Sequence, residues 1–389
     1  MEDHSAILST VVIIIITAVL FISIFKKLKL SPILGYFLAG SILGEHGLCV
    51  VKSEQTEFFG EIGVAFLLFA TGSALTISRL KAMKSFVLGL GSTQIIITAL
   101  CITLATTFIG TNYIESIIIG ISAAFSSTAI ALQLIAEKEV ARSKTRKLSL
   151  SILLMQDFAV IPIIIIIPVL CQDSTSVATS IAQASIKSLC TVFAIFIIGK
   201  AFLKPIYKQI HSLSPSTSSE LFIATTLAIA LGTSWLTSFM GLSLELGAFI
   251  SGVVVAEAEL HNQAEKSIKP FQSLLLGLFF MTIGMTIDID ILKENFIIVC
   301  ASAIGIMAIK IIIIFFLCKA YKFSNMISFK TGLFLCQIGE FAFIVFRLAE
   351  EYNLITSDNY QLLLIIITTT MALTPIFTKI SYRYFIKHH

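Results

Sequence analysis

The chain has 389 residues, of which 57% are apolar and only 13% are charged, and its formal net charge is +4. Ordinary soluble domains are about 45–50% apolar and about 25% charged, because polar residues must cover their cores. The composition therefore excludes an ordinary soluble domain. It predicts an all-α protein that crosses a membrane many times.

Polar breaks divide the chain into about 13 apolar segments, and a helix needs about 20 such residues to cross about 30 Å of hydrocarbon. In chain order the predicted spans are 7–25, 31–47, 57–75, 84–107, 114–136, 147–171, 180–203, 218–237, 240–257, 266–287, 295–318, 328–350 and 359–380. The first span follows Glu2 and Asp3 rather than basic residues, so we expect a permanent span and not a cleaved signal peptide. The 7 cysteines are scattered without metal-type spacing, and we expect them to pack as small apolar residues.

Most of the 27 basic residues fall in alternate loops between the predicted spans. These basic segments are 26–29, 79–84, 138–147, 200–208, 266–269, 319–330 and 379–387. By the positive-inside rule this side of the membrane is cytoplasmic. The pattern predicts a multi-pass protein with its N-terminus outside and its C-terminus in the cytoplasm.

Four polar groups from four predicted spans lie at similar depth. Such groups are functional candidates, because an ionisable side chain in the bilayer costs about 2.5–3.5 kcal/mol on insertion scales. Asp157 and Glu340 each follow the nearest cytoplasmic lysine by ten residues, or about 15 Å of helix. Lys310 and the run 126–128 reach about 14–18 Å by the same measure. We therefore expect these groups to meet near the midplane.

Asp157 is the predicted carrier, because it lies in an apolar stretch and its nearest polar neighbour is Gln156. Burial away from water favours the neutral, protonated form of a carboxyl group. A proton or a monovalent cation can neutralise this carboxylate, but not easily both at once. If only the neutralised form crosses between inward-facing and outward-facing states, the two ions must exchange. One carboxylate beside a neutral glutamine predicts electroneutral exchange, although a titrating Lys310 would change the charge moved.

Two spans contain polar residues typical of a discontinuous helix. They are the fifth, with Ser126, Ser127 and Thr128, and the twelfth, with the run 337–340. Unwound segments free backbone carbonyls to hold cations at the midplane, and two such spans seven apart suit an inverted repeat. Packing of small hydroxyl residues between helices is the alternative interpretation.

Two further charges have open roles. Lys310 is either an active group or a fixed countercharge to Glu340, Glu245 or Asp157. Glu245 either lines a pathway or pairs with Lys310. We therefore predict Asp157, Gln156, Ser126, Ser127 and Thr128 as the residues that bind the ion and proton, with Asp157 contacting the monovalent cation. Glu340, Lys310 and Glu245 are predicted supporting charges.

The sequence resembles the cation/proton antiporter superfamily, specifically its Kef-type potassium/proton branch, in a series of short motifs along nearly the whole chain. The matching stretches are 34–40, 61–64, 126–129, 156–157, 247–253, 276–280, 283–285, 309–310 and 339–343. The resemblance implies a sodium/proton-antiporter-like fold with two crossing broken helices, and a homodimer. It also implies a mobile core, including 114–171 and 295–350, with dimerisation helices elsewhere.

Three features depart from the Kef pattern. Family members often have an acidic residue where this chain has the run 72–75, and Glu245 stands where a neutral residue is usual. Many also continue into a cytoplasmic nucleotide-binding domain, which we do not expect within 1–389, because no glycine-rich motif opens a βαβ unit. We expect no cofactor beyond the transported K⁺ or Na⁺ and H⁺. A separate cytoplasmic regulatory subunit is an alternative means of control, and no nucleic-acid partner is expected.

With this resemblance, the sequence favours a potassium/proton antiporter of a bacterial inner membrane that works by alternating access. Sodium/proton exchange is the nearest alternative, because one carboxylate with a few oxygens does not fix ion size. A cation channel and a non-transporting membrane sensor are alternatives of a different class. No arrangement of nucleophile and base supports an enzyme.

Overall fold

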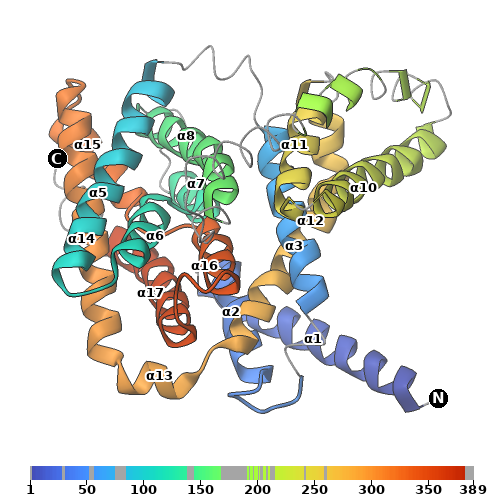
Figure 1. The fold of residues 1–389 in the computed structure, drawn as a ribbon, viewed down its shortest axis with the longest axis horizontal. Helices are drawn as coiled ribbons and strands as arrows, with labels where there is room; N and C mark the ends of the chain where they lie inside the picture. Colours follow the sequence, from blue (N-terminus) through green and yellow to red (C-terminus); the bar gives the residue numbers. More distant parts are fainter. Residues whose placement is uncertain are drawn as a thin grey trace, which may run out of the picture. The chain divides into compact units, whose positions relative to one another are not determined.

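The computed structural model describes residues 2–28, 31–51, 57–74, 85–137, 144–167, parts of 191–210, 215–240, 242–257 and 261–381. These residues form helices and connecting turns, with no strand among them. The helices are α1 (Glu2–Lys27), α2 (Pro32–Leu43), α3 (Glu57–Ala74), the π-helix η2 (Ser85–Gly91), α5 (Ser92–Phe108), α6 (Tyr113–Ala124), α7 (Thr128–Glu137), α8 (Lys144–Ile166), α10 (Pro215–Phe239), α11 (Leu244–Glu257), α12 (His261–Thr286), α13 (Ile289–Glu294), α14 (Phe296–Ala320), α15 (Asn325–Phe334), α16 (Phe341–Glu351) and α17 (Ser357–Ser381) (Figure 1).

Within the described residues, 7 helical segments are long and apolar enough to cross a membrane, and 3 shorter apolar helices accompany them. This confirms an all-α, multi-pass membrane protein. The count of 13 spans stays a prediction, because the segment 180–203 lies largely outside the described residues. The predicted span 328–350 is divided between α15 and α16, which are 10 and 11 residues long.

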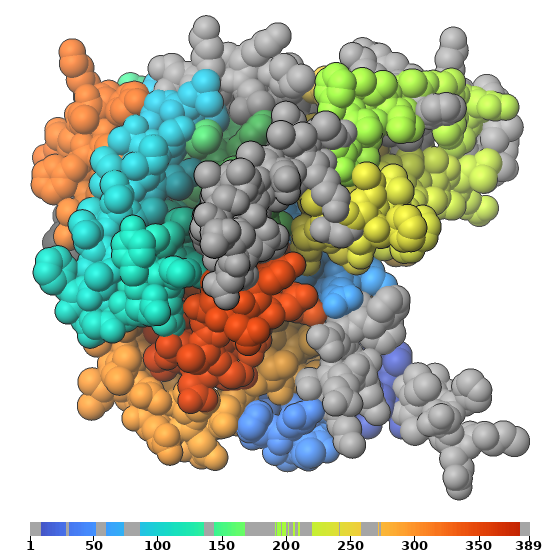
Figure 2. Space-filling model, in the orientation of Figure 1, coloured from blue at the N-terminus to red at the C-terminus, as the bar shows by residue number. Residues whose placement is uncertain are grey.

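The chain divides into two compact units. Unit 1 consists of Met1–Ala39, Met83–Val160 and Ile287–His389. Within it, α14 packs against α5, α15 and α17, and α6 packs against α5 and α16. Helix α7 contacts α15 and α17. In Figure 2 the side chains of α5 and α6 form one contiguous surface, coloured cyan to teal. The predicted midplane residues Asp157, Lys310, Glu340 and 126–128 all belong to this unit.

Unit 2 consists of Gly40–Ala82 and Ile161–Thr286. Its helices α3, α11 and α12 pack closely, with α10 against α11 and α12. Two glycines allow the α3–α11 contact, because a Cβ on Gly72 would overlap the Phe249 carbonyl and one on Gly252 would overlap the Phe69 carbonyl. Helix–helix interfaces in membranes commonly use small residues in this way, so that backbones approach closely.

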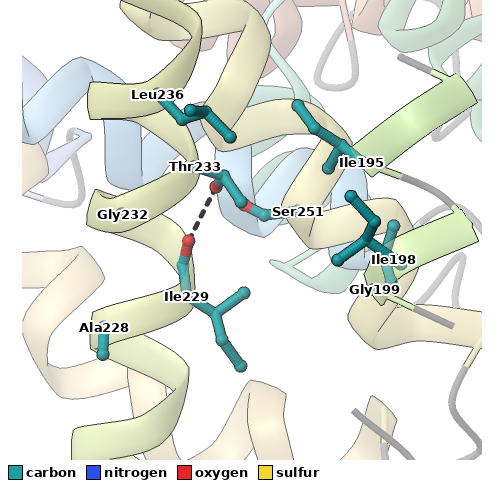
Figure 3. Close-up of a pocket in the computed structure, with 10 residues that line it drawn as sticks. Ile195, Ile198, Gly199, Ala228, Ile229, Gly232, Thr233, Leu236 and Ser251 are labelled. Atoms are coloured by element: carbon teal, nitrogen blue, oxygen red, sulfur yellow. Dashed lines mark hydrogen bonds between the residues drawn. The ribbon is translucent and has the colours of Figure 1, made fainter. Parts of the chain in front are cut away.

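A cavity of about 290 Å³ in unit 2 lies among α10, α11 and the helical residues Ile195, Ile198 and Gly199 (Figure 3). Its lining is almost wholly apolar, with Ile195, Ile198 and Leu236 among its residues. The Thr233 hydroxyl in its wall is already engaged, since it donates to the Ile229 carbonyl of its own helix at 2.6 Å. This lining offers little to bind an ion.

The short helix α13 carries Lys293, one of the basic residues outside the predicted cytoplasmic loops. Its ammonium group is exposed and donates to the Asp290 carboxylate at 2.7 Å. The hydrogen bond to Asp290 and its negative charge raise the pKa of Lys293. The lysine is therefore neutralised locally, which weakens its effect on the charge balance between the loops.

Candidate functional site

Two broken helices meet in unit 1. Helices α6 and α7 are separated by the non-helical residues 125–127, and α15 and α16 by residues 335–340. The two breaks are joined directly, because the Gly339 N–H donates to the Phe125 carbonyl at 3.1 Å. The Ser126 hydroxyl donates to the Leu335 carbonyl at 2.7 Å. The breaks predicted at 126–128 and 337–340 are present, and they lie in contact.

Gly339 makes this close approach possible. A Cβ at this position would lie 2.6 Å from the Ser126 carbonyl carbon and 2.9 Å from the Ser127 nitrogen. Both neighbours are backbone atoms, which cannot turn aside as a flexible side chain can. Helix α17 supports the same break from another direction, since the buried Thr370 hydroxyl accepts the Ile338 N–H at 3.1 Å.

Lys310 links the two breaks near the carboxyl-terminal ends of the helices that precede them, α6 and α15. Its side chain is fully buried in the middle of α14, and its ammonium group donates three hydrogen bonds to backbone carbonyls. The acceptors are Ala123 at 2.8 Å, Phe125 at 2.7 Å and Gln337 at 2.7 Å. None of these partners is one of the carboxylates that the sequence suggested as a countercharge. The positive charge instead faces the negative ends of two helices, which is favourable.

Glu340 lies at a positive helix end of the same crossing. It directly precedes α16, is 5% exposed, and its carboxylate interacts with the Ser127 hydroxyl and the backbone amides of Thr128 and Ala129. Those amides open α7, so a negative charge sits at the positive end of that helix. Lys310 and Glu340 thus each face helix ends of opposite sign.

Asp157 lies beside this crossing on α8. Its side chain is half-buried, and within the described residues no hydrogen bond to its carboxylate is recorded. Glu340 is close enough to act on it electrostatically. The Asp157 carboxylate therefore keeps its oxygens free for a proton or a cation. Further along α8, Pro162 has no N–H, so it cannot donate to the Phe158 carbonyl as another helical residue would.

The neighbouring Gln156 is fully engaged by protein groups. Its side-chain oxygen accepts the Ser126 N–H at 2.9 Å. Its amide nitrogen donates to the Ala124 carbonyl at 3.0 Å and to the Gln94 side-chain oxygen at 2.8 Å. Gln156 therefore ties α8 to the break between α6 and α7.

Gln94, on α5, did not enter the sequence-based prediction. It lies ten residues after Lys84, so the depth measure that selected Asp157 places it at about 15 Å too. The signal was present, but a neutral amide does not carry the insertion cost that drew attention to the charged residues.

Several oxygens around the crossing lack partners. Among the described residues, the buried atoms without a hydrogen bond include Thr128 Oγ1, Gln337 Oε1, Glu340 Oε2 and Ser122 Oγ. Among the residues that the structure describes, no three His, Cys, Asp or Glu side chains are arranged so that they could hold a metal ion together. Carboxylate, hydroxyl and carbonyl oxygens without imidazole or thiolate suit a hard cation rather than a transition metal.

Glu245 belongs to unit 2. It lies half-buried in the first turn of α11, which belongs to unit 2, whereas Lys310, Asp157 and Glu340 belong to unit 1. Its predicted role as a supporting charge stays a prediction.

The chain is similar in sequence to known transmembrane exchangers. The sequence model of a family described as "Sodium/hydrogen exchanger, transmembrane" matches residues 12–381. The K(+) efflux antiporter 2, chloroplastic, of Arabidopsis thaliana is 37% identical over 96% of this chain and 32% of its own length. The K(+) efflux antiporter 3, chloroplastic, of the same plant is 35% identical over 94% of this chain and 50% of its own length. The chain thus spans about a third to a half of these relatives.

A solved structure shares the fold. The sodium proton antiporter MjNhaP1 from Methanocaldococcus jannaschii at pH 8 superposes with a TM-score of 0.68 over 98% of both chains, at 20% sequence identity. At this identity the likeness concerns the fold, and it confirms the antiporter-like architecture expected from the sequence.

Proposed function

Because the chain belongs to the family of transmembrane sodium/hydrogen exchangers, we propose that it exchanges K⁺ for H⁺ by alternating access, with Asp157 as the shared carrier. The observation that supports this most is the position of Asp157. Its carboxylate has no hydrogen bond among the described residues, and it lies beside two crossing broken helices whose own charges are already balanced.

The choice of potassium rests on the relatives. The proteins that are 35–37% identical over most of this chain are named K(+) efflux antiporters. The sodium proton antiporter with the same fold is 20% identical. Sodium/proton exchange is the second candidate, because the unpartnered oxygens near the crossing do not by themselves select an ion radius.

The exchange follows from the cost of moving an unneutralised carboxylate through a low-dielectric region. On one side of the membrane Asp157 releases its proton and binds the cation, with Thr128 and the carbonyls of the break as further oxygen ligands. The neutralised site then opens to the other side, where a proton displaces the cation. Gln156, Ser126 and Ser127 hold the break, while Lys310 and Glu340 balance the helix ends throughout.

The test is proton movement in proteoliposomes that carry a pH indicator inside. Adding K⁺ outside should alkalinise the lumen, because each K⁺ that enters is exchanged for a proton that leaves, and Na⁺ should be less effective. Asp157→Asn should abolish the signal, because an amide cannot bind a proton and a cation in turn. Asp358→Asn makes the same chemical change at an exposed position on α17 and should transport normally.

Other outcomes would favour the other candidates. A larger response to Na⁺ than to K⁺ would select sodium exchange. Cation flux without proton movement would indicate a channel. The absence of any cation-driven proton movement in a folded preparation would reject the antiporter and favour a membrane sensor.

We further propose that the chain works as a homodimer in the lipid bilayer of a bacterial plasma membrane, with its N-terminus outside. Unit 1 carries Asp157, Lys310 and Glu340 and would be the mobile core. The mass of the protein in detergent or nanodiscs tests the dimer, and a monomeric, active preparation would contradict it. Control by a separate cytoplasmic subunit remains a prediction, tested by co-purification.

A further inference from the structure

We propose that Gln94 is a positioning residue of the transport site, which acts through Gln156 to hold the break between α6 and α7 beside Asp157. That this site carries out transport rests on the proposed function, whereas the contact between Gln94 and Gln156 does not. Gln94 is fully buried and lies on α5, while Gln156 is 1% exposed and directly precedes Asp157 on α8. Their side chains and the Ala124 carbonyl form one connected hydrogen-bond network.

The backbone of the break sets the orientation of both amides. The Ser126 N–H can only donate, so the group it meets must be the Gln156 oxygen, at 2.9 Å. The Gln156 nitrogen then faces the other way, towards the Ala124 carbonyl at 3.0 Å and the Gln94 oxygen at 2.8 Å. The Gln94 nitrogen in turn donates to the Ala124 carbonyl at 3.2 Å and to the Thr98 hydroxyl at 3.1 Å.

Ala124 is the residue at which α6 ends, so its carbonyl has lost its helical partner. It accepts one hydrogen bond from each glutamine instead. The network thus satisfies the last carbonyl of α6 and the Ser126 amide, which are the two backbone groups that flank Phe125. A buried group left without its partner costs about 1–3 kcal/mol, so the two glutamines favour one geometry of the break.

Helix α5 reaches this position through the turn before it. The π-helix η2 ends at Gly91, where a Cβ would overlap the Cβ of Met155 on α8. Because Gly91 lacks a side chain, the start of α5 lies directly against the turn of α8 that carries Gln156. Gln94 is one helical turn further along α5 and faces the same partner.

This network also favours a neutral amide at position 156. An ionised carboxylate there would present an oxygen, instead of an N–H, to the Ala124 carbonyl and to the Gln94 oxygen, and like partial charges would face each other. The contacts with Gln94 and Ala124 therefore disfavour a second carboxylate next to Asp157 in this helical turn.

The test is a double-mutant cycle of Gln94→Ala and Gln156→Ala, read in two ways. In proteoliposomes, Gln94→Ala should raise the half-saturating K⁺ concentration about fivefold, as expected when a positioning hydrogen bond of about 1 kcal/mol is lost. Added to Gln156→Ala, it should change that concentration less than about twofold, because its partner is already gone. Independently of transport, hydrogen exchange of the segment 124–128 should quicken in each single variant and no further in the double variant.

Thr98→Val is the matched control. It removes a partner of Gln94 on the same buried helix face but leaves the contacts of Gln94 with Gln156 and Ala124, so both readings should stay near those of the native chain. The proposal is overturned if Gln94→Ala changes neither reading in a folded protein, if the two effects multiply in the double variant, or if Thr98→Val reproduces them. If the hydrogen-exchange effects of the two variants are coupled but the native chain moves no protons, the contact between Gln94 and Gln156 stands and the proposed function is rejected.

Discussion

The ammonium group of Lys310 has three hydrogens, and each meets a backbone carbonyl at 2.7–2.8 Å. A buried charge is tolerated when such partners replace its hydration, and these carbonyls belong to two different chain breaks. At the residue scale, Lys310 therefore holds the breaks together as much as it supplies charge. Of the two roles considered from the sequence, this favours a fixed charge over an active group that titrates during the cycle.

Replacing Lys310 with methionine tests this role. The change keeps the length of the side chain but leaves three buried carbonyls without donors, and hydrogen bonds to charged groups contribute about 1.5–3 kcal/mol each. We expect the unfolding free energy to fall by about 3 kcal/mol or more, seen as a large drop in the thermal midpoint in detergent. Lys319→Met, at an exposed position of the same helix, should change the midpoint little. Equal midpoints for the two variants would reject the role.

The charged and hydroxyl residues of the site could be predicted from the sequence, because each is costly or unusual in an apolar span. Their charge and their similar depth single out Asp157, Glu340 and Lys310, and these three residues lie in one unit. Their partners could not be predicted. Lys310 meets carbonyls instead of a carboxylate, because the ends of broken helices offer concentrated negative potential that one-dimensional spacing does not reveal.

At the scale of helices, the crossing depends on backbone reaching backbone. Hydroxyls and glycine in the runs 126–128 and 337–340 indicated the breaks, and the structure has non-helical residues at both. The hydrogen bond between Gly339 and Phe125 could not be predicted from the sequence, because contacts between segments some 200 residues apart leave no local pattern. Hydropathy does not reveal the division of the span 328–350, because α15 and α16 are both apolar.

Gly339→Ala tests the crossing. The added Cβ would fall within 2.6–2.9 Å of the Ser126 and Ser127 backbone, so the two breaks must separate. We expect at least a tenfold loss of exchange rate and a destabilised protein, since overpacking typically costs about 1–3 kcal/mol. Gly305→Ala on α14 is the control, because a Cβ there meets nothing within 4 Å. It should be neutral or slightly stabilising, and similar losses in both variants would contradict this account.

At the scale of the whole molecule, the basic loops predict which way the chain crosses the membrane. Cys49 is exposed and follows α2 on the side predicted to be external. In a chain whose other cysteines are replaced by alanine or serine, a membrane-impermeant maleimide added to intact cells should label Cys49. Labelling that requires permeabilised cells would place the N-terminus inside and reverse the proposed direction of every span.

The stoichiometry is also a property of the whole molecule, because it depends on how many charges move together. Among the described residues of the site, Asp157 is the carboxylate without a hydrogen bond, whereas Glu340 is held by the amides of α7 and Lys310 by three carbonyls. If the last two stay in place, one cation moves against one proton and no net charge crosses. The final pH gradient then depends on the K⁺ gradient and not on the membrane potential.

A potential of 100 mV is equivalent to about 2.3 kcal/mol for each charge moved. It can be imposed on proteoliposomes with a gradient of the permeant anion thiocyanate while the K⁺ gradient is held constant. For one-for-one exchange we expect the same final pH gradient with and without the potential. Exchange of two protons for one cation would shift that gradient by about 0.8 pH units, half of the single-charge equivalent. Such a shift would mean that Glu340 or Lys310 takes part in the cycle. Glu340→Gln would then identify the second carrier, since it should remove the shift if Glu340 is responsible.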